Sequence, residues 1–479
     1  MYRFNILLEI TMKKIFLTAV LILTASSTFA DTHNANCTQA SIEAAITASQ
    51  DGDTVAIGNG SCTFTSQVTV TKAITIMGNS TPSITNTLLT NSGGIFVFEM
   101  DQNTASKKWR INGSTFKGDA GVQITGSSKY SSAGGWRIDN CRFDNMTNCG
   151  IEVNGPTFGV IDHCTFYSSA GGNFTGVYIF GGPSVSDAGN TSWATGLTIG
   201  TADAVFIEDC TFTRVGSIGP KGYFDGRNGA RVVFRYNTVT EWFSYVHDAQ
   251  TGQTRGWMQT EMYNNTFQPD PTNGYSRAIW IKGGTGIIYD NTFYETGGGF
   301  SQNSPVLIGN YRSCVSGNPP GDPWDGWCNG TFTEKFCSNS NTYPRNCTQD
   351  SDCGTGGVCT QVDGNQSGKN GYPCRDQIGW TGGAVQTSSP MYFWNNIWTK
   401  AGKGNVTPDI NSGGSCDIDY HPNHIKIGRD VFVATDKTDA ISKGLNTYYP
   451  NYASYTYPHP LSRPSQSPSP PTNLRIIQQ

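Results

Sequence analysis

Charged residues are scarce in this sequence, and basic residues are not in excess. Only 14% of the 479 residues are Asp, Glu, Lys or Arg, and the formal net charge at pH 7 is −4. A chain without clustered lysine and arginine lacks the groups that neutralise a phosphate backbone. We therefore expect that this protein does not bind nucleic acid.

Long apolar runs are absent after the first thirty residues. Lys13 and Lys14 precede an apolar stretch at 15–23, and small residues follow up to Ala30. This order is typical of a cleaved export signal over residues 1–30, which is too short to span a membrane. No later stretch approaches the ~18–20 apolar residues of a spanning helix. The sequence predicts a secreted protein, extracellular or periplasmic, with no membrane partner.

One eight-residue phrase recurs along the rest of the chain. Its third and eighth positions are apolar in every copy, which predicts two short strands that both face a core. A repeat of this length is typical of a solenoid, in which each unit buries its core against its neighbours. The interval of 46 residues between two of the copies predicts an additional rung there. The copies begin at residues 109, 136, 159, 205, 232, 260, 286 and 391.

The fold class predicted from these columns is all-β: a right-handed parallel β-helix with roughly ten or more rungs. We place the sixth position at the bend between the two strands. There asparagine tolerates a left-handed backbone, and its amide can bond the same amide one rung away. The three cysteines of this column are expected to be buried, stacked thiols. The sixth position reads Ser114, Cys141, Cys164, Cys210, Asn237, Asn265, Asn291 and Asn396.

The remaining segments are expected to cap or decorate the coil. Residues 41–64 predict a short amphipathic helix, a turn and a first strand, and such a helix would protect the open end of the coil. Cys37 and Cys62 flank it and are either bridged or both free. Seven cysteines at 299–390 interrupt the repeat and predict a disulfide-rich insertion. The expected organisation is a signal peptide at 1–30, the capped β-helix at 31–298, the insertion at 299–390, the last rungs and a C-terminal cap at 391–461, and a Pro/Ser-rich tail at 462–479.

The fourth position of the phrase carries the strongest functional signal. Because the third position points into the core, strand alternation turns the fourth outward. Stacked about 4.8 Å apart, its members form a stripe of carboxylates, one guanidinium and aromatic rings. Such a stripe suits an acidic sugar, and the alternative is a solvated face without a ligand. The predicted polysaccharide-binding members are Asp139, Asp162, Glu208, Arg235, Tyr263, Tyr289 and Trp394.

The stretch 221–261 holds most of the candidate catalytic residues. Cleavage of a uronan by β-elimination needs a neutralised carboxylate and a base for the adjacent C–H proton. We predict Arg235 as the neutralising group and Lys221 or His247 as the base. Arg255 and Glu261 complete the catalytic candidates, and Arg227 is a further substrate-binding candidate. Calcium, bound by carboxylates, is an alternative neutraliser, with Asp162, Glu208 and Asp225 as its candidate ligands.

Two other functions stay open on the same scaffold. A glycoside hydrolase would use two carboxylates from adjacent rungs of the fourth column. A surface or matrix protein would bind the glycan without cutting it. In each case we expect a monomer whose partner is a polysaccharide.

Two resemblances bear on the fold. Residues 160–166 are similar to a W-I-D-H-C/N phrase of the first pectate lyase family, but neither the calcium segment nor the R-x-P-x-x-R motif of that family follows. Residues 232–237, His247, 261–265, 372–379 and 455–461 resemble bacterial secreted β-helix repeat proteins of the pectate-lyase-like superfamily. This resemblance implies a β-helix and secretion, and it leaves the activity open.

Overall fold

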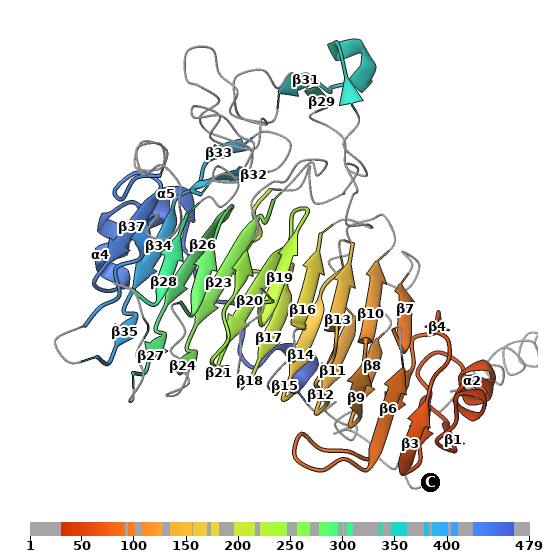
Figure 1. The fold of residues 1–479 in the computed structure, drawn as a ribbon. Coiled ribbons are helices and arrows are strands. Elements are labelled where there is room, and N and C mark those ends of the chain that lie inside the picture. Colours follow the sequence, from red (N-terminus) through yellow and green to blue (C-terminus); the bar gives the residue numbers. More distant parts are fainter. Residues whose placement is uncertain are drawn as a thin grey trace, which may run out of the picture.

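Three long parallel sheets, wound from one continuous coil of short strands, form the body of the protein (Figure 1). The structure is a computed structural model. It describes residues 30–91, 94–100, 108–126, 135–155, 157–169, 174–181, 196–215, 221–246, 256–268, 277–295, 300, 304–309, 335–337, 346–361, 378–382, 386–400, 404–410 and 425–463. The predicted signal peptide and most of the predicted insertion lie outside these residues.

Sheet A has twelve strands and contains the first strand of every repeated phrase. Neighbouring strands pair in register, so that Ile111, Ile138 and Ile161 occupy equivalent positions. The strands in spatial order are β1 (Thr32–Ala35), β2 (Thr54–Ile57), β5 (Thr75–Met77), β8 (Trp109–Asn112), β11 (Trp136–Asp139), β14 (Gly159–Asp162), β17 (Val205–Glu208), β20 (Arg231–Arg235), β23 (Gln259–Tyr263), β26 (Thr285–Tyr289), β34 (Met391–Trp394) and β37 (Val431–Ala434).

Sheet B has ten strands and contains the second strand of each phrase. Its inward phenylalanines stack face to face, with ring centroids 4.5 Å apart between Phe166 and Phe212. The strands are β3 (Gly60–Thr63), β6 (Thr87–Asn91), β9 (Thr115–Gly118), β12 (Arg142–Asp144), β15 (Thr165–Ser168), β18 (Thr211–Arg214), β21 (Thr238–Thr240), β24 (Thr266–Gln268), β27 (Thr292–Phe293) and β35 (Ile397–Trp398).

Sheet C also has ten strands and lies outside the repeated phrase. Isoleucines and valines of these strands point into the coil and pack against the apolar side chains of sheets A and B in one hydrophobic core. The strands are β4 (Val68–Val70), β7 (Phe96–Met100), β10 (Ala120–Gly126), β13 (Cys149–Asn154), β16 (Thr175–Phe180), β19 (Phe224–Arg227), β22 (Tyr245–Val246), β25 (Ile279–Ile281), β28 (Val306–Ile308) and β36 (Asp409–Ile410).

The bend between sheets A and B differs from the predicted one by a single residue. The left-handed backbone falls at the fifth position of the phrase, where φ is 56° at Asn264, and not at the sixth. Placing it at the sixth position was wrong, because the sixth side chain is needed inside the coil. The fifth positions with φ between 50° and 65° are Gly113, Asn140, His163, Asp209, Tyr236, Asn264, Asp290 and Asn395.

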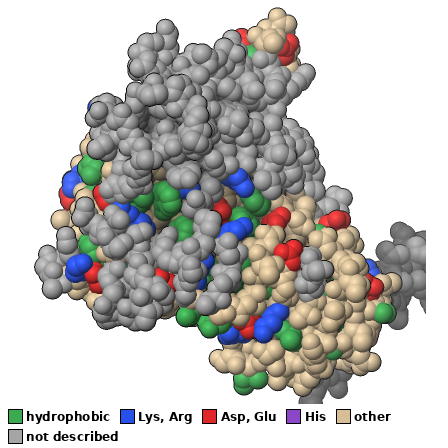
Figure 2. Space-filling model, in the orientation of Figure 1, with side chains coloured by type: hydrophobic (Ala, Val, Ile, Leu, Met, Phe, Trp, Pro, Cys, Tyr) green, Lys and Arg blue, Asp and Glu red, His purple; other side chains and the backbone are tan. Residues whose placement is uncertain are grey.

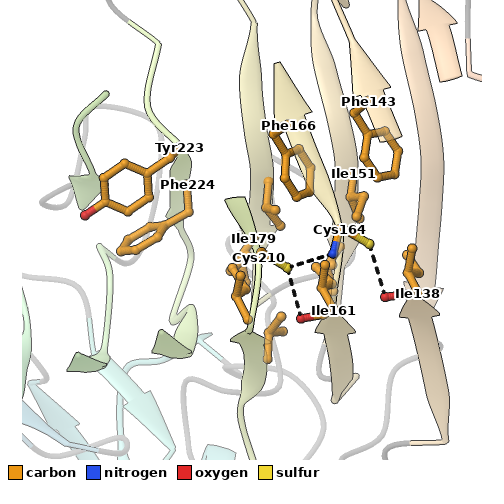
Figure 3. Close-up of a cluster of buried hydrophobic side chains, with 14 of the residues drawn as sticks. Ile138, Phe143, Ile151, Ile161, Cys164, Phe166, Ile179, Cys210, Tyr223 and Phe224 are labelled. Carbon is orange, nitrogen blue, oxygen red and sulfur yellow. Dashed lines mark hydrogen bonds between the residues drawn. The ribbon is translucent and has the colours of Figure 1, made fainter. Parts of the chain in front are cut away.

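The sixth position forms the predicted internal ladder. The Asn265 amide nitrogen donates to Oδ1 of Asn291 at 2.9 Å, and Asn237 donates to Oδ1 of Asn265 at 3.1 Å. Cys164 and Cys210 continue the ladder as buried free thiols, and the backbone N–H of Cys164 lies 3.4 Å from the Cys210 sulfur (Figure 3). The expectation of stacked, unbridged cysteines is confirmed for this column.

The 46-residue interval holds no additional rung. Strands β14 and β17 are direct neighbours in sheet A, with Ile161 paired to Ile207. The extra length connects β16 to β17 instead, so the prediction of another rung was wrong. A surface connection can lengthen without disturbing the strands that it joins.

Both ends of the coil carry helices (Figure 1). Helix α2 (Gln39–Ala48) packs on β1 and β2, as the predicted N-terminal cap, and a Cys37–Cys62 disulfide ties the preceding loop to β3. Strand β1, which extends sheet A beyond β2, was not predicted. At the other end, α4 (Lys437–Ser442) and α5 (Leu445–Tyr448) follow β37.

Parts of the predicted insertion are described. Strand β28 belongs to sheet C, so the coil continues into the range 299–390. Strands β29 (Lys335–Cys337), β30 (Asn346–Cys347) and β31 (Cys359–Gln361) form a small antiparallel sheet with the 3₁₀ helix η4 (Asp350–Cys353), and β32 (Trp380–Gly382) pairs with β33 (Gln386–Ser388). Cys353 and Cys359 each take part in a disulfide. Among the described residues, no helix is long and apolar enough to cross a bilayer.

The asparagine ladder yields a stability prediction. Asn265→Ala would leave the buried backbone N–H of Asn237 and the carbonyl of Phe234 without the partners that Asn265 gives them. Each unsatisfied group costs about 1–3 kcal/mol, so we expect the free energy of unfolding to fall by about 2–4 kcal/mol. Chemical denaturation measures this. Thr266→Ala, on the neighbouring outward position, is the control, and equal effects of the two substitutions would contradict the ladder.

Candidate functional site

The fourth-position residues line up on one outer face of sheet A, as predicted. Asp139 pairs in register with Asp162, Asp162 with Glu208, and Glu208 with Arg235. The aromatic members continue the same column through Tyr263, Tyr289 and Trp394. The sequence repeat therefore correctly predicted that these residues, which are far apart in the chain, lie in one column.

This face is covered by the C-terminal segment, residues 449–463, which returns along the coil and includes η5 (Pro460–Ser462). The Arg235 guanidinium donates to the carbonyls of Tyr455 and Thr456 at 2.6 and 2.9 Å. The backbone N–H of His459 and the hydroxyl of Ser462 donate to Glu208. Asp139, Asp162, Glu208 and Arg235 are each 0% exposed. In this conformation none of them can touch a polysaccharide, and their sugar-binding and catalytic roles stay predictions.

Each carboxylate of the column already has a cationic partner. Asp139 accepts from Arg110 at 2.6 and 2.7 Å, and Asp162 accepts from Arg137 at 2.7 and 2.8 Å. Glu208 lies 2.6 Å from Arg235. Arg110 and Arg137 occupy the second position of the phrase, which also faces outward. This pairing was not predicted, although two outward columns flank the inward third position in every copy.

These pairings bear on the predicted calcium ligands. Both oxygens of Asp162 accept protein donors, as do both of Glu208, whereas calcium takes six to eight oxygen ligands. Asp225 lies in sheet C, on another face of the coil. The three residues therefore cannot ligate one ion. Among the described residues, no group of three or more His, Cys, Asp or Glu could hold a metal ion.

The aromatic members of the column stack on one another. Ring centroids are 4.8 Å apart between Tyr263 and Tyr289, and 4.6 Å apart between Tyr289 and Trp394, with nearly parallel planes. Tyr452 of the C-terminal segment packs its ring nearly perpendicular to the last two. Both faces of the Tyr289 ring therefore pack against other rings of the column. Only the edges of these rings point outward.

Glu261 lies buried next to the same column. It accepts the backbone N–H of Gly200 at 2.9 Å and the hydroxyl of Tyr452 at 2.9 Å. Burial in this apolar setting raises the pKa of Glu261 to about 7. The predicted catalytic residue is therefore enclosed by two segments that the coil packs over sheet A.

The other catalytic candidates lie elsewhere. His247 and Arg255 fall outside the described residues. Lys221, Asp225 and Arg227 belong to the outer face of sheet C, in or directly before β19, and Lys221 and Arg227 are partly exposed. The structure thus divides the predicted site between two faces of the coil.

On the outer face of sheet C, polar and aromatic side chains form two adjoining columns. Register places Gln123, Glu152, Tyr178 and Asp225 in one column. Asn154, Phe180 and Arg227 form the other. Most of these residues were not predicted, because no repeated phrase marks sheet C. Alternation about inward Ile151 and Val153, and about Val177 and Ile179, is the signal that could have found them.

Direct contacts connect these columns. The Lys221 ammonium donates to the Tyr178 hydroxyl at 3.1 Å, and the Arg227 guanidinium lies over the Phe180 ring. Glu152 accepts from both Gln123 and Asn154. Tyr178 and Phe180 pack side by side with ring centroids 5.5 Å apart. Figure 2 shows one face of the coil, on which basic and acidic side chains are interspersed rather than gathered in one patch.

Two buried side chains donate hydrogen bonds to the backbone of Lys221. Its backbone carbonyl accepts from the indole N–H of Trp242 at 2.9 Å and from Arg214 at 3.3 Å. Arg214 and Trp242 are 1% and 2% exposed. These two donors fix the backbone of Lys221 directly before β19.

Comparison with known families decides the architecture. Residues 102–267 match the family described as "Right handed beta helix region". The protein is a right-handed parallel β-helix. The β-helix implied by the resemblance in the sequence, with its N-terminal cap, is confirmed. A search of curated proteins finds no match.

Two solved structures are similar to the β-helix at low identity. The alginate lyase from Paenibacillus sp. str. FPU-7 is 14% identical with a TM-score of 0.39, covering 59% of this chain and 91% of that one. The PL6 family alginate lyase AlyGC is 12% identical with a TM-score of 0.37, covering 84% of this chain and 53% of that one. At these scores neither structure carries an argument about activity.

A stability measurement can separate a structural from a catalytic role of Arg235. Arg235→Met would leave Glu208 buried without its cation, and such breaks cost about 3–5 kcal/mol. Arg235→Met/Glu208→Gln should recover part of this loss in chemical denaturation. Arg110→Met is the matched control and should cost less, because Asp139 keeps a second cation, Arg137, at 3.4 Å. A stable Arg235→Met variant without activity would instead support catalysis.

The raised pKa of Glu261 predicts that the stability of the folded protein depends on pH. Its ordinary pKa is 4.5 and its folded pKa is about 7, so between these values the folded state binds more protons than the unfolded state. The free energy of unfolding should therefore fall as pH rises through this window, by about 3 kcal/mol.

The measurement compares the wild type with Glu261→Gln, because burial of His459 lowers its pKa to about 4 and gives an opposing slope. The stability of Glu261→Gln relative to the wild type should rise from pH 4.5 to pH 7. Parallel pH profiles of the two proteins would show that Glu261 does not titrate in this window.

Proposed function

We propose that this protein is a secreted polysaccharide lyase that cleaves a uronate-containing polysaccharide on the outer face of sheet C. The observation that supports this most is the Lys221–Tyr178 contact on a partly exposed face, where Arg227 packs on the neighbouring Phe180 ring. An amine and a phenol in direct contact can move protons, and a nearby guanidinium can pair with a carboxylate. No equivalent group of accessible side chains is found on the described part of sheet A.

The reaction assigned to this site is β-elimination. Arg227 pairs with the uronate carboxylate and stabilises the negative charge that develops when the C5 proton leaves. Lys221 takes that proton in its deprotonated form only, because the ammonium that donates to Tyr178 has no free electron pair. The electron pair of the C5–H bond forms the C4–C5 double bond while the C4–O bond breaks, and the leaving oxygen takes a proton from Tyr178 or water. Arg227 replaces Arg235 as the neutralising group, because Arg235 is enclosed beneath the C-terminal segment.

This assignment uses no calcium, because Arg227 takes the role of the neutralising group. A contribution of Asp225 to calcium binding stays a prediction. Dialysis against EDTA, followed by addition of calcium, tests it in the same assay.

A second function is favoured by one observation. Glu152 and Asp225 stand two rungs apart in one column, about 10 Å between their backbones, and inverting glycoside hydrolases use carboxyl groups roughly 6.5–9.5 Å apart. Release of reducing ends without an increase in ultraviolet absorbance would support a glycoside hydrolase. Binding of the glycan without reducing ends and without absorbance would support a glycan-binding protein that has no catalytic activity.

Lys221→Met tests the lyase proposal. The purified protein is incubated with alginate, polygalacturonate and glycosaminoglycans, and absorbance of the unsaturated product is followed. We expect the variant to lose at least about 100-fold in rate, the usual range for removing a general base. Its thermal unfolding should stay close to that of the wild type, because the ammonium is partly exposed.

Lys117→Met is the matched control, since Lys117 is a surface lysine of sheet B whose side chain is 46% exposed. Its activity should equal that of the wild type. Full activity of Lys221→Met would remove sheet C as the site of catalysis, and a wild type inactive on all acidic polysaccharides would overturn the lyase proposal.

A further inference from the structure

A cavity lies on the sheet A side of the coil, near its C-terminal end. Its volume is about 380 Å³, within the range of sites that hold small ligands. It is separate from the sheet C residues assigned to catalysis. The cavity is lined by Tyr289, Asp290, Trp394, Asn395, Asp436, Lys437, Tyr452, Ala453 and Ser454.

Three structural features meet at this cavity. The aromatic column ends there, because Trp394 pairs in the next rung with Ala434, which has no ring. The left-handed bends at Asp290 and Asn395 lie in adjacent rungs, and Asn395 donates to Asp290 at 2.6 Å. The C-terminal segment contributes Tyr452 and Ser454 as the third wall.

The polar groups of the cavity are mainly acceptors. Asp290 and Asp436 contribute two carboxylates, and one oxygen of Asp436 caps helix α4. Lys437 is the one cation among the nine lining residues, and its ammonium donates to the carbonyl of Tyr452 at 2.7 Å. An acidic ligand would therefore meet a net negative wall, whereas hydroxyl groups would find acceptors.

We propose that this cavity binds an uncharged sugar unit. The ring edges of Tyr289 and Trp394, with the Tyr452 ring, supply an apolar wall for its C–H groups, and the two carboxylates accept its hydroxyl protons. On the outer face of sheet C, Lys221 and Arg227 supply cations for a uronate, and Glu152 and Asp225 stand on the same face. Discrimination against acidic sugars by charge is thus a property of the cavity alone.

The consequence is an accessory site that does not depend on the proposed lyase activity. Sheets A and C are different faces of the coil. A neutral polysaccharide bound at the cavity would hold the protein in a mixed polymer while the face of sheet C remains free. Binding at the cavity then raises the local concentration of acidic chains that accompany the neutral one.

The test blocks the cavity with a large side chain. Ser454 is exposed, so Ser454→Trp can fill the space without disturbing the core. Affinity electrophoresis in gels containing xylan, galactomannan or mixed-linkage β-glucan should show retardation of the wild type by at least one of them. Ser454→Trp should bind at least about tenfold more weakly, the loss of most contacts of a small ligand.

Two controls separate this inference from the lyase proposal. Thr456→Trp, exposed in the same segment and outside the cavity, should bind the neutral polysaccharide like the wild type. Lys221→Met should also bind it normally, and Ser454→Trp should still cleave an acidic polysaccharide if the wild type does. If Ser454→Trp does not fold, Asp290→Asn replaces it, because asparagine suits the φ of 54° at this position and removes only the charge. It should weaken neutral-sugar binding several-fold.

The inference is overturned if none of the three neutral polysaccharides retards the wild type. It is also overturned if Ser454→Trp binds them as tightly as Thr456→Trp does, or if alginate or polygalacturonate binds more tightly than the neutral polymers and loses that binding in Ser454→Trp. Loss of uronan cleavage in Lys221→Met alone leaves this result unaffected.

Discussion

In-register parallel pairing from rung to rung is the constraint on which the rest of this structure depends. Because each residue pairs with its equivalent in the next turn, one column repeats a single environment along the whole coil. Inside, this produces the asparagine and phenylalanine ladders. On the outer surface, the same pairing places residues of like charge only one rung apart, and these residues need oppositely charged partners.

The compensation on sheet A explains why the most conspicuous column is not open. Asp139 and Asp162 are paired with arginines of the neighbouring column, and Glu208 with Arg235 of its own. The C-terminal segment then satisfies the donors and acceptors that remain. A buried charge without a partner is costly, so this face and its cover stabilise each other. The stripe that suggested a binding groove holds the C-terminal segment, residues 449–463, in place.

The two proposed sites differ in their charged groups. The face of sheet C combines Lys221 and Arg227 with two carboxylates, whereas the cavity beside sheet A is lined by Asp290 and Asp436. In a solenoid, residues far apart in sequence share a face only if the register brings them there. The same scaffold can therefore carry both of the sites that we propose.

The sequence by itself determined the coil, its capping helix and the columns, because the apolar third and eighth positions repeat with the turn of the solenoid. It also determined the internal ladder of Cys164, Cys210 and the asparagines. Only the tertiary structure decided which outer face is covered, because the C-terminal segment meets Glu208 and Arg235 from more than 200 positions away. It likewise decided the contact between Lys221 and Tyr178, since sheet C has no repeated phrase and its register follows from the turns between the strands.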